Sequence, residues 1–270
     1  MELRFSPLFS GSSGNATYIG CDNAHILLDA GVSGSRVTAE LQRVGVDPSM
    51  LNAILVTHEH SDHIKGIGII SRKYDLPVYA TEGTWAGMYS KIGNIPAKNV
   101  RFIQPAQDFY VGPIDITPFP IPPDAGQPVG YTFELSGAKL AVATDVGGPR
   151  ESWMKYIYGA GAVILESNYD PGMLTSGPYP YDLKKRIMGK HGHLSNADAG
   201  EIAVELTRRG TRQIILAHLS KENNYPALAL TTCESMFLDN GLIPQEDAKI
   251  IVASREGNIG MFSVTAEFEM

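Results

Sequence analysis

The stretch from Ile54 to Gly66, ILVTHEHSDHIKG, decides the fold of this protein. It begins with an apolar, partly β-branched run that predicts a buried strand. Three histidines and an aspartate follow within six residues: His58, His60, Asp62 and His63. Positions i and i+2 of an extended segment point the same way, so His58 and His60 can face one point before the chain turns to bring in the other two.

These four side chains predict a metal centre. Neutral imidazole and carboxylate groups are ligands of Zn, Mn and Fe. Three histidines and an acid placed directly after a buried strand would be costly to bury without a partner. The chain holds seven histidines in all, so a chance run of surface histidines is a poor explanation. We expect one or two divalent ions here, because four ligands in one turn can serve two adjacent sites.

The composition limits what else the chain can be. It is 43% hydrophobic, enough for a sizeable core, and its longest apolar runs are too short to span a membrane. The N-terminus does not have the pattern of a signal peptide. Cys21 and Cys233 are the only cysteines, which favours a reducing, cytoplasmic location. The net charge of −7 argues against broad nonspecific binding of nucleic acid but allows a local basic patch.

The order of the segments predicts an α/β sandwich with a site at the strand ends. We find no repeat and no low-complexity linker, and expect residues 1–270 to form a single domain. Strands are predicted at residues 15–20, 24–31, 53–57, 139–145, 160–168, 213–220 and 249–257, and helices at residues 35–46, 64–77, 196–210 and 227–241. A Pro-rich, hairpin-like region covers residues 99–130.

The motifs together resemble the metallo-β-lactamase-fold hydrolases, whose signature is HxHxDH after a buried strand. The resemblance runs along almost the whole chain. SGSSGN (10–15), LLDAG (27–31), THEHSDHIKG (57–66), ATDVG (143–147), ESNYD (166–170), GHLSN (192–196) and LAHLSKENN (216–224) come in the order of the YycJ/WalJ-like branch. The resemblance implies a four-layer αββα sandwich of the metallo-β-lactamase type. It also implies a metal-dependent nuclease.

The resemblance assigns two further ligands, each at the end of an apolar run. Asp145 ends LAVATD and is implied to bridge two metals, and His218 ends QIILAH and matches the last histidine ligand. From the residues alone, Asp145 could equally cap a turn and His218 could be a core histidine. The resemblance thus implies two metal sites that share Asp145. The first also has Asp62, His63 and His218, and the second also has His58 and His60.

The chain departs from the branch at two positions. A histidine is expected just before the DA of the Pro-rich hairpin, but the sequence has Pro123 there. Proline has no side-chain ligand, so we expect a weakened second site, with Asp124 as a substitute or as an ordinary turn residue. The branch also has a histidine after ESN, where this chain has Tyr169. We expect Tyr169 and Asp29 to lie behind the ligands, with Asp29 oriented toward one of the histidines.

A late segment points to a phosphodiester substrate. In GHLSNADAGEIAVEL, His193 and Ser195 stand just before an amphipathic helix, with Ser195 or Asn196 as its N-cap. Free N–H groups at a helix start attract phosphate. The arrangement is similar to the HST segment of tRNase Z-type phosphodiesterases, which implies that His193 meets the phosphate or protonates the leaving oxygen. Asp62 is expected to orient the attacking water.

The preceding segment is basic and suits a polyanion. Lys184, Lys185 and Arg186 are expected to contact the backbone of the substrate, although a solvated helix face explains them as well. The resemblance implies DNA, degraded 5′ to 3′. Two alternatives remain open at this stage: a hydrolase of small thioesters or lactones on the same fold, and a metal-binding regulatory protein without activity. The sequence indicates no protein partner and no membrane.

Overall fold

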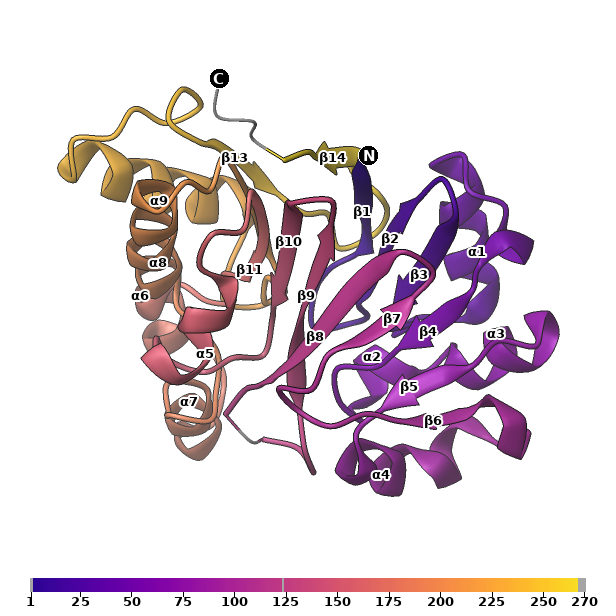
Figure 1. The fold of residues 1–270 in the computed structure, drawn as a ribbon. Helices are drawn as coiled ribbons and strands as arrows, with labels where there is room; N and C mark the ends of the chain where they lie inside the picture. The colour runs from indigo at the N-terminus through magenta and orange to yellow at the C-terminus, as the bar shows by residue number, and fades with distance from the viewer. Residues whose placement is uncertain (1, 123, 267–270) are drawn as a thin grey trace.

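The computed structural model describes residues 2–122 and 124–266, and it contains two seven-stranded sheets packed face to face (Figure 1). The first sheet has the order β14 (Phe262–Val264), β1 (Leu3–Phe9), β2 (Ala16–Cys21), β3 (Ala24–Leu28), β4 (Ala53–Leu55), β5 (Val78–Ala80) and β6 (Val100–Phe102). The second has the order β13 (Lys249–Val252), β12 (Gln213–Ala217), β11 (Ala162–Glu166), β10 (Ala138–Ala143), β9 (Val129–Leu135), β8 (Ile114–Pro120) and β7 (Phe109–Val111).

Helices cover the outer faces of both sheets (Figure 1). Those of the first half of the chain are α1 (Gly34–Arg43), α2 (Ser61–Ile64), α3 (Ile67–Tyr74) and α4 (Glu82–Ile92), with short 3₁₀ turns at Pro48–Met50 and Ala97–Asn99. Those of the second half are α5 (Glu151–Ile157), α6 (Pro171–Ser176), α7 (Tyr181–Ile187), α8 (Asn196–Arg208) and α9 (Pro226–Asp239). No helix within the described ranges is long and apolar enough to cross a membrane.

The four layers follow from the alternation of side chains along each strand. In β4, Ala53 and Leu55 join the core between the sheets, whereas Ile54 packs under the helices of the first half. In β10, Leu140 and Val142 face the other sheet, and Ala141 and Ala143 pack in the core under α5 and α8. Strands that are buried on both faces read as continuous apolar runs. The predicted αββα sandwich is confirmed.

The sheet topology brings the polar strand ends to one edge of the sandwich. β3 runs parallel to β4, and β10, β11 and β12 run parallel to one another. Their carboxyl ends are followed by the polar residues of the LLDAG, THEH, ATDVG, ESN and LAHLS motifs. Three of these residues, Asp29, Asp145 and His218, have left-handed backbones with φ of 58°, 57° and 56°. Asp and His adopt this conformation more readily than most side chains.

Two of the N-terminal motifs support the turn that carries the histidines. The N–H of Asn15 in SGSSGN donates to the Asp62 carbonyl at 2.8 Å, and the N–H of Ala30 in LLDAG donates to the His63 carbonyl at 2.7 Å. A Cβ on Gly31 would lie 1.6 Å from the Asp62 carbonyl oxygen. Only glycine fits at that distance, which explains the DAG sequence.

The structure divides the helix predicted at residues 64–77. α2 ends at Ile64 and α3 begins at Ile67, because the chain between them passes close to another backbone. A Cβ on Gly66 would lie 2.6 Å from the Val32 carbonyl oxygen. Strand β1 was also missed in the sequence analysis, and its run LRFSPLF contains a serine and a proline. Of the two residues proposed as the N-cap of α8, Ser195 takes that position.

Candidate metal centre

The histidine turn places its side chains at the end of β4. His58 and His63 are buried, with ring centroids 4.1 Å apart. His58 Nε2 lies 3.0 Å from His60 Nδ1, so these two rings meet as the i and i+2 spacing predicts. Asp62 lies on the other side of His63, with its Oδ2 3.7 Å from His63 Nε2.

A buried hydrogen-bond network orients His63. Its Nδ1 lies 2.8 Å from Asp29 Oδ2 and 3.2 Å from the Thr57 hydroxyl. Asp29 also accepts from the N–H and the hydroxyl of Thr57, at 2.9 and 2.8 Å. Nε2 of His63 is therefore directed at the cluster, where it lies 3.4 Å from Asp145 Oδ2. The structure thus places Asp29 behind a histidine, where we expected it.

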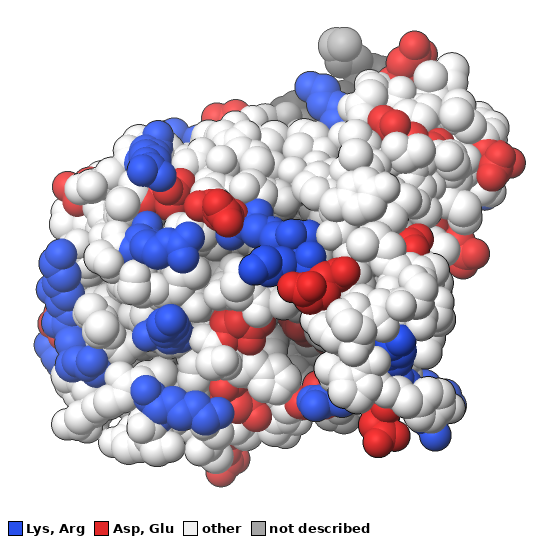
Figure 2. Space-filling model, turned by 180° about the vertical axis from the view of Figure 1, so that it is seen from behind, with Lys and Arg blue, Asp and Glu red and all other residues white. Residues whose placement is uncertain are grey.

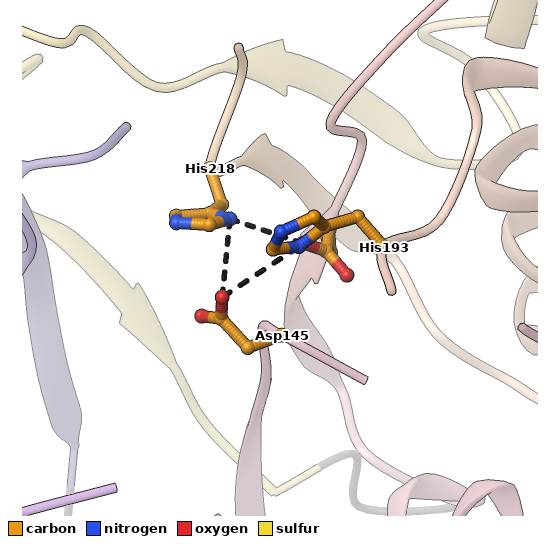
Figure 3. A group of neighbouring side chains, drawn as sticks. Asp145, His193 and His218 are labelled. Carbon is orange, nitrogen blue, oxygen red and sulfur yellow. Dashed lines mark hydrogen bonds and ion pairs between the residues drawn. The ribbon is translucent and has the colours of Figure 1, made fainter. Parts of the chain in front are cut away.

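Four more groups follow β10, end β11, follow β12 or precede α8, and Figure 3 shows three of them, Asp145, His193 and His218. Asp145 Oδ1 lies 3.6 Å from both His193 Nδ1 and His218 Nδ1. Glu166, at the end of β11, is fully buried, and its Oε1 lies 2.7 Å from His193 Nδ1 and 3.0 Å from His218 Nδ1. Its Oε2 accepts from the N–H groups of Val146 and Leu194, both at 3.1 Å.

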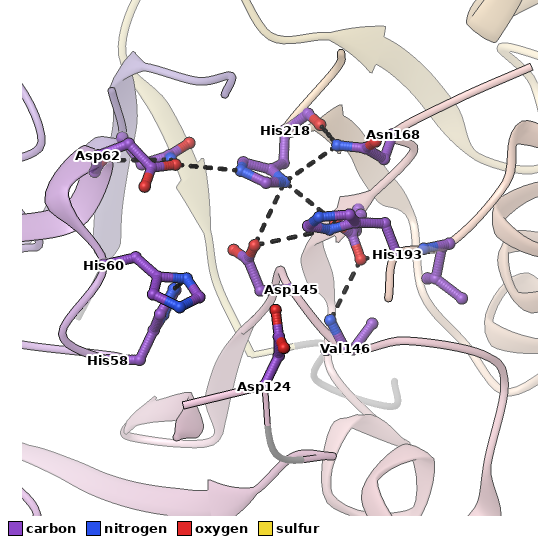
Figure 4. A network of polar contacts seen from close by, with 12 residues as sticks. His58, His60, Asp62, Asp124, Asp145, Val146, Asn168, His193 and His218 are labelled. Carbon is purple, nitrogen blue, oxygen red and sulfur yellow. Dashed lines mark hydrogen bonds and ion pairs between the residues drawn. The ribbon is translucent and has the colours of Figure 1, made fainter. Parts of the chain in front are cut away.

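Three groups of side chains have ligand atoms within 4.8 Å of one another. They are His58, His63 and Asp145; Asp62, His63 and His218; and Asp145, Glu166, His193 and His218. The second group, with Asp145 beside it, matches one of the two sites that the sequence predicted. For the other predicted site, His58 is grouped with His63 and Asp145, and His60 lies next to His58 with its Nδ1 3.0 Å from His58 Nε2 (Figure 4).

Two buried atoms in this cluster lack a hydrogen-bond partner among the described residues: Asp145 Oδ2 and His218 Nε2. Buried polar atoms are nearly always paired, and each unpaired one costs free energy. An anionic oxygen and an imidazole nitrogen are also metal ligands. A divalent cation between the two sheets would satisfy both atoms, so the residues present fit a metal ion.

The electrostatics of the cluster favour ionised carboxylates. Burial would raise the pKa of Asp62, but His218 and His63 lower it to about 2. Burial also opposes the ionised form of Asp145, yet the neighbouring histidines hold its pKa well below its usual range. Burial would lower the pKa of His63, but Asp29 and Asp145 raise it to about 10. The carboxylates thus favour a positive charge at the centre of the cluster, as they do at a metal site.

A cavity of about 290 Å³ opens over the cluster. It is lined by Ser12 of the SGSSGN motif and by His58, His60, Asp62, Asp145, His193 and His218. Asp124 and Arg186 close one side, with Arg186 Nη2 2.9 and 2.7 Å from the two carboxylate oxygens. Asp124 is thereby engaged in an ion pair. Pro123, which we expected to weaken one site, lies outside the described residues.

The residues predicted to contact substrate at the start of α8 make structural contacts instead. Ser195 caps α8 in a capping box with Asp198. Asn196 is buried and bonds Ser167 and Asn224, and Tyr169 is buried beside Ser195. None of the three lines the described part of the cavity. Burial raises the pKa of Tyr169 to about 12.

The three cations predicted to contact the substrate do not form one continuous track. Arg186 lines the cavity, Lys184 donates to the Thr175 carbonyl at 2.8 Å, and Lys185 is exposed. On the face opposite to that of Figure 1, Lys and Arg are more numerous over the half with α1, α3 and α4, and Asp and Glu over the other half (Figure 2). The negative net charge is therefore unevenly spread.

Sequence reasoning missed two residues of the cluster. Glu166 touches both His193 and His218, and Asn168 donates to the His218 carbonyl at 2.7 Å (Figure 4). Both belong to the ESN motif that follows AVIL. The signal was present, because an acid at the end of an apolar strand next to LAVATD repeats the pattern of Asp145.

Comparison with known proteins now places the chain. Residues 24–219 match the family model of the beta-lactamase superfamily domain. The chain belongs to this superfamily. Within it, the chain is 42% identical to exodeoxyribonuclease YycJ of Bacillus anthracis over 242 residues, covering 89% of this chain and 91% of that protein. It is 38% identical to exodeoxyribonuclease WalJ of Streptococcus pneumoniae, covering 85% and 86%. The predicted resemblance to the YycJ/WalJ-like branch is confirmed.

A solved structure supports the superfamily fold. The metallo-beta-lactamase fold protein YhfI from Bacillus subtilis superposes with a TM-score of 0.71 at 16% identity, covering 97% of this chain and 100% of that chain. At this identity the likeness concerns the fold. Together with the His and Asp cluster, membership of the superfamily identifies this chain as a binder of divalent metal.

Proposed function

We propose that this protein is a metal-dependent phosphodiesterase that degrades DNA from strand ends, 5′ to 3′. The convergence of Asp62, His63 and His218 with Asp145 below an open cavity carries the proposal. Two relatives that align over most of both chains are named exodeoxyribonucleases, which supports DNA as the polymer. One or two ions of Zn or Mn, or Fe, would suit the N and O ligands.

In this proposal the metal is held by His58, His60, Asp62, His63, Asp145 and His218. A bound divalent metal would lower the pKa of water and would neutralise charge on the phosphate oxygens. Asp62 lies at the cavity floor, where its free carboxylate oxygen can orient the attacking water. Glu166 holds Nδ1 of His193, so the ring of His193 presents Nε2 to the substrate, next to the leaving oxygen.

Substrate contacts are proposed on one side of the cavity. Arg186 is the cation best placed for a phosphate, and Lys184 and Lys185 lie on the same helix, α7. Ser195 and Asn196 would act through the start of α8 rather than by direct contact. Tyr169, packed against Ser195, would fix that start.

We further propose that residues 1–270 function as one domain in the cytoplasm. The two sheets share one apolar core, which supports a single cooperative unit. Cys21 and Cys233 are buried and unpaired, as is usual in a reducing compartment.

The test is degradation of end-labelled single- and double-stranded DNA, and of RNA, by the pure protein with Mn²⁺ or Zn²⁺. Asp62→Ala should abolish the activity, whereas Asp22→Ala, on the surface, should keep it. Label at either end gives the polarity. If neither polymer is cut with either metal, the proposal fails, and hydrolysis of a thioester or lactone by the same preparation would establish the alternative.

A further inference from the structure

One wall of the cavity is apolar, and the metal chemistry does not use it. We propose that Tyr179, Leu183 and Ile187 form a platform for the terminal nucleobase, so that the substrate is an unpaired strand end. This inference rests on the proposed function, and it adds how the end of a strand is recognised. The three residues are called the α7 wall.

The spacing of the α7 wall explains why two of its members share one face. Leu183 and Ile187 are four residues apart on α7 and so share one face of this helix, and Tyr179 lies in the bend just before its N-cap, Pro180. All three line the cavity. An apolar stripe at this spacing normally packs into a core, but α7 has no buried residue and Leu183 is 37% exposed. The stripe therefore faces the cavity instead of the interior.

Tyr179 has the chemistry of a stacking residue. Within the part of the chain that the structure describes, its ring makes no hydrogen bond, ion pair or ring contact. Tyr179 is partly exposed and lines the cavity, and aromatic side chains stack on any base without reading its sequence. Pro122 and Pro128 line the same cavity and add apolar surface around a base.

The size of the cavity limits what can reach the metal centre. About 290 Å³ is at the lower end of small-molecule pockets, room for about one nucleotide. A single base therefore suits this cavity better than a base pair does. The scissile phosphate reaches the floor only when the last nucleotide is unpaired, and its base then lies along the α7 wall.

The ion pair between Arg186 and Asp124 holds this wall in place. It joins α7 to the segment before β9, with both Asp124 carboxylate oxygens within 2.9 Å of Arg186 Nη2. Arg186 is one helical turn from Leu183, so a phosphate contact and a base contact would come from the same short helix (Figure 1).

The test compares two DNA ends and three variants. A single-stranded oligonucleotide with a normal terminal nucleotide is compared with one whose terminal nucleotide is abasic. For the natural protein, we expect the abasic end to raise KM about tenfold. Tyr179→Ala should raise KM for the normal end by a similar factor and should abolish the difference between the ends. Tyr179→Phe should keep the difference, because the ring remains.

Tyr181→Ala is the matched control, since Tyr181 lies on the same helix, is 77% exposed and does not line the cavity. Binding is read independently of turnover, without added metal, from the quenching of a terminal 2-aminopurine. Natural protein and Tyr181→Ala should quench it, and Tyr179→Ala should not. The inference is overturned if Tyr179→Ala still distinguishes the two ends, or if blunt duplex is degraded as well as single strands. Failure of the natural protein to cut any DNA would instead refute the proposed function.

Discussion

Asp29 Oδ2 lies 2.8 Å from His63 Nδ1, on the side of the ring away from the cluster, while His63 Nε2 points at Asp145 from 3.4 Å. The carboxylate thus fixes which nitrogen of His63 can serve as a ligand. Carboxylates that hold a metal-binding histidine from behind set its tautomer and raise its basicity.

Asp29→Asn should therefore weaken metal binding without removing any ligand. An asparagine whose amide nitrogen meets His63 Nδ1 cannot accept its proton, and we expect metal affinity to fall by about 10- to 100-fold. Titration calorimetry with Mn²⁺ or Zn²⁺ measures this. Asp22→Asn, a surface change at a carboxylate that is 92% exposed, is the control and should bind as the natural protein does. Equal affinity in Asp29→Asn would show that Asp29 does not orient a ligand.

Glu166→Gln should lower both stability and activity. The carboxylate of Glu166 accepts four hydrogen bonds, from two histidines and two backbone N–H groups. A glutamine at this place turns one acceptor into a donor and leaves buried N–H groups unpaired, which costs about 1–3 kcal/mol. Urea unfolding without metal measures the loss. Unchanged stability would contradict a structural contribution of this network.

Added metal should stabilise the fold, and His218 should be needed for the effect. A ligand that binds only the folded state at about 100 times its Kd adds about 2.7 kcal/mol. Differential scanning fluorimetry should show a rise in Tm with Mn²⁺ or Zn²⁺ that EDTA reverses. His218→Ala should lose most of this rise, whereas His191→Ala, at an exposed histidine, should keep it. An equal rise in both variants would place the metal elsewhere.

Glu40 should make the stability depend on pH at a point far from the metal centre. This buried residue of α1 accepts from the N–H and the side-chain amide of Asn258, at 3.1 and 2.6 Å, and pairs with Arg43. Burial opposes ionisation, but these partners lower the pKa below its ordinary value of 4.5. The stabilisation is therefore complete above that value and is lost as the pH falls through the lowered pKa.

Urea unfolding at several pH values tests this. At pH 7, Glu40→Gln should be less stable than the natural protein by about 1–3 kcal/mol, and the difference should shrink below pH 4.5. Glu256→Gln is the control, at an exposed position two residues before Asn258. It should change neither the stability at pH 7 nor the dependence of the stability on pH. A difference independent of pH would mean that the charge of Glu40 is not involved.

Sequence reasoning reached the fold through short motifs at strand ends. ILVTHEHSDH, LAVATD and QIILAH each combine an apolar run with a polar end, and parallel strands bring such ends to one edge. Glu166 was not predicted, although AVILE has the same form, an apolar run that ends in an acid. The grouping of His58 with His63 and Asp145 depends on how the chain turns after β4, and spacing does not fix that turn. The cavity wall that contains Tyr179 was not predicted, because it depends on where α7 lies in the fold and this helix has no buried residue.

The residues of the metal centre come from both halves of the chain, and this determines when the centre can form during synthesis. Residues 58–63 leave the ribosome long before His218, and the parallel strands β10, β11 and β12 are complete only once residue 217 has emerged. A nascent chain of 150 residues therefore holds the histidine turn and Asp145 but still lacks His193 and His218. We expect metal capture to be a late event of synthesis, which protects the growing chain from binding an ion in a half-formed site.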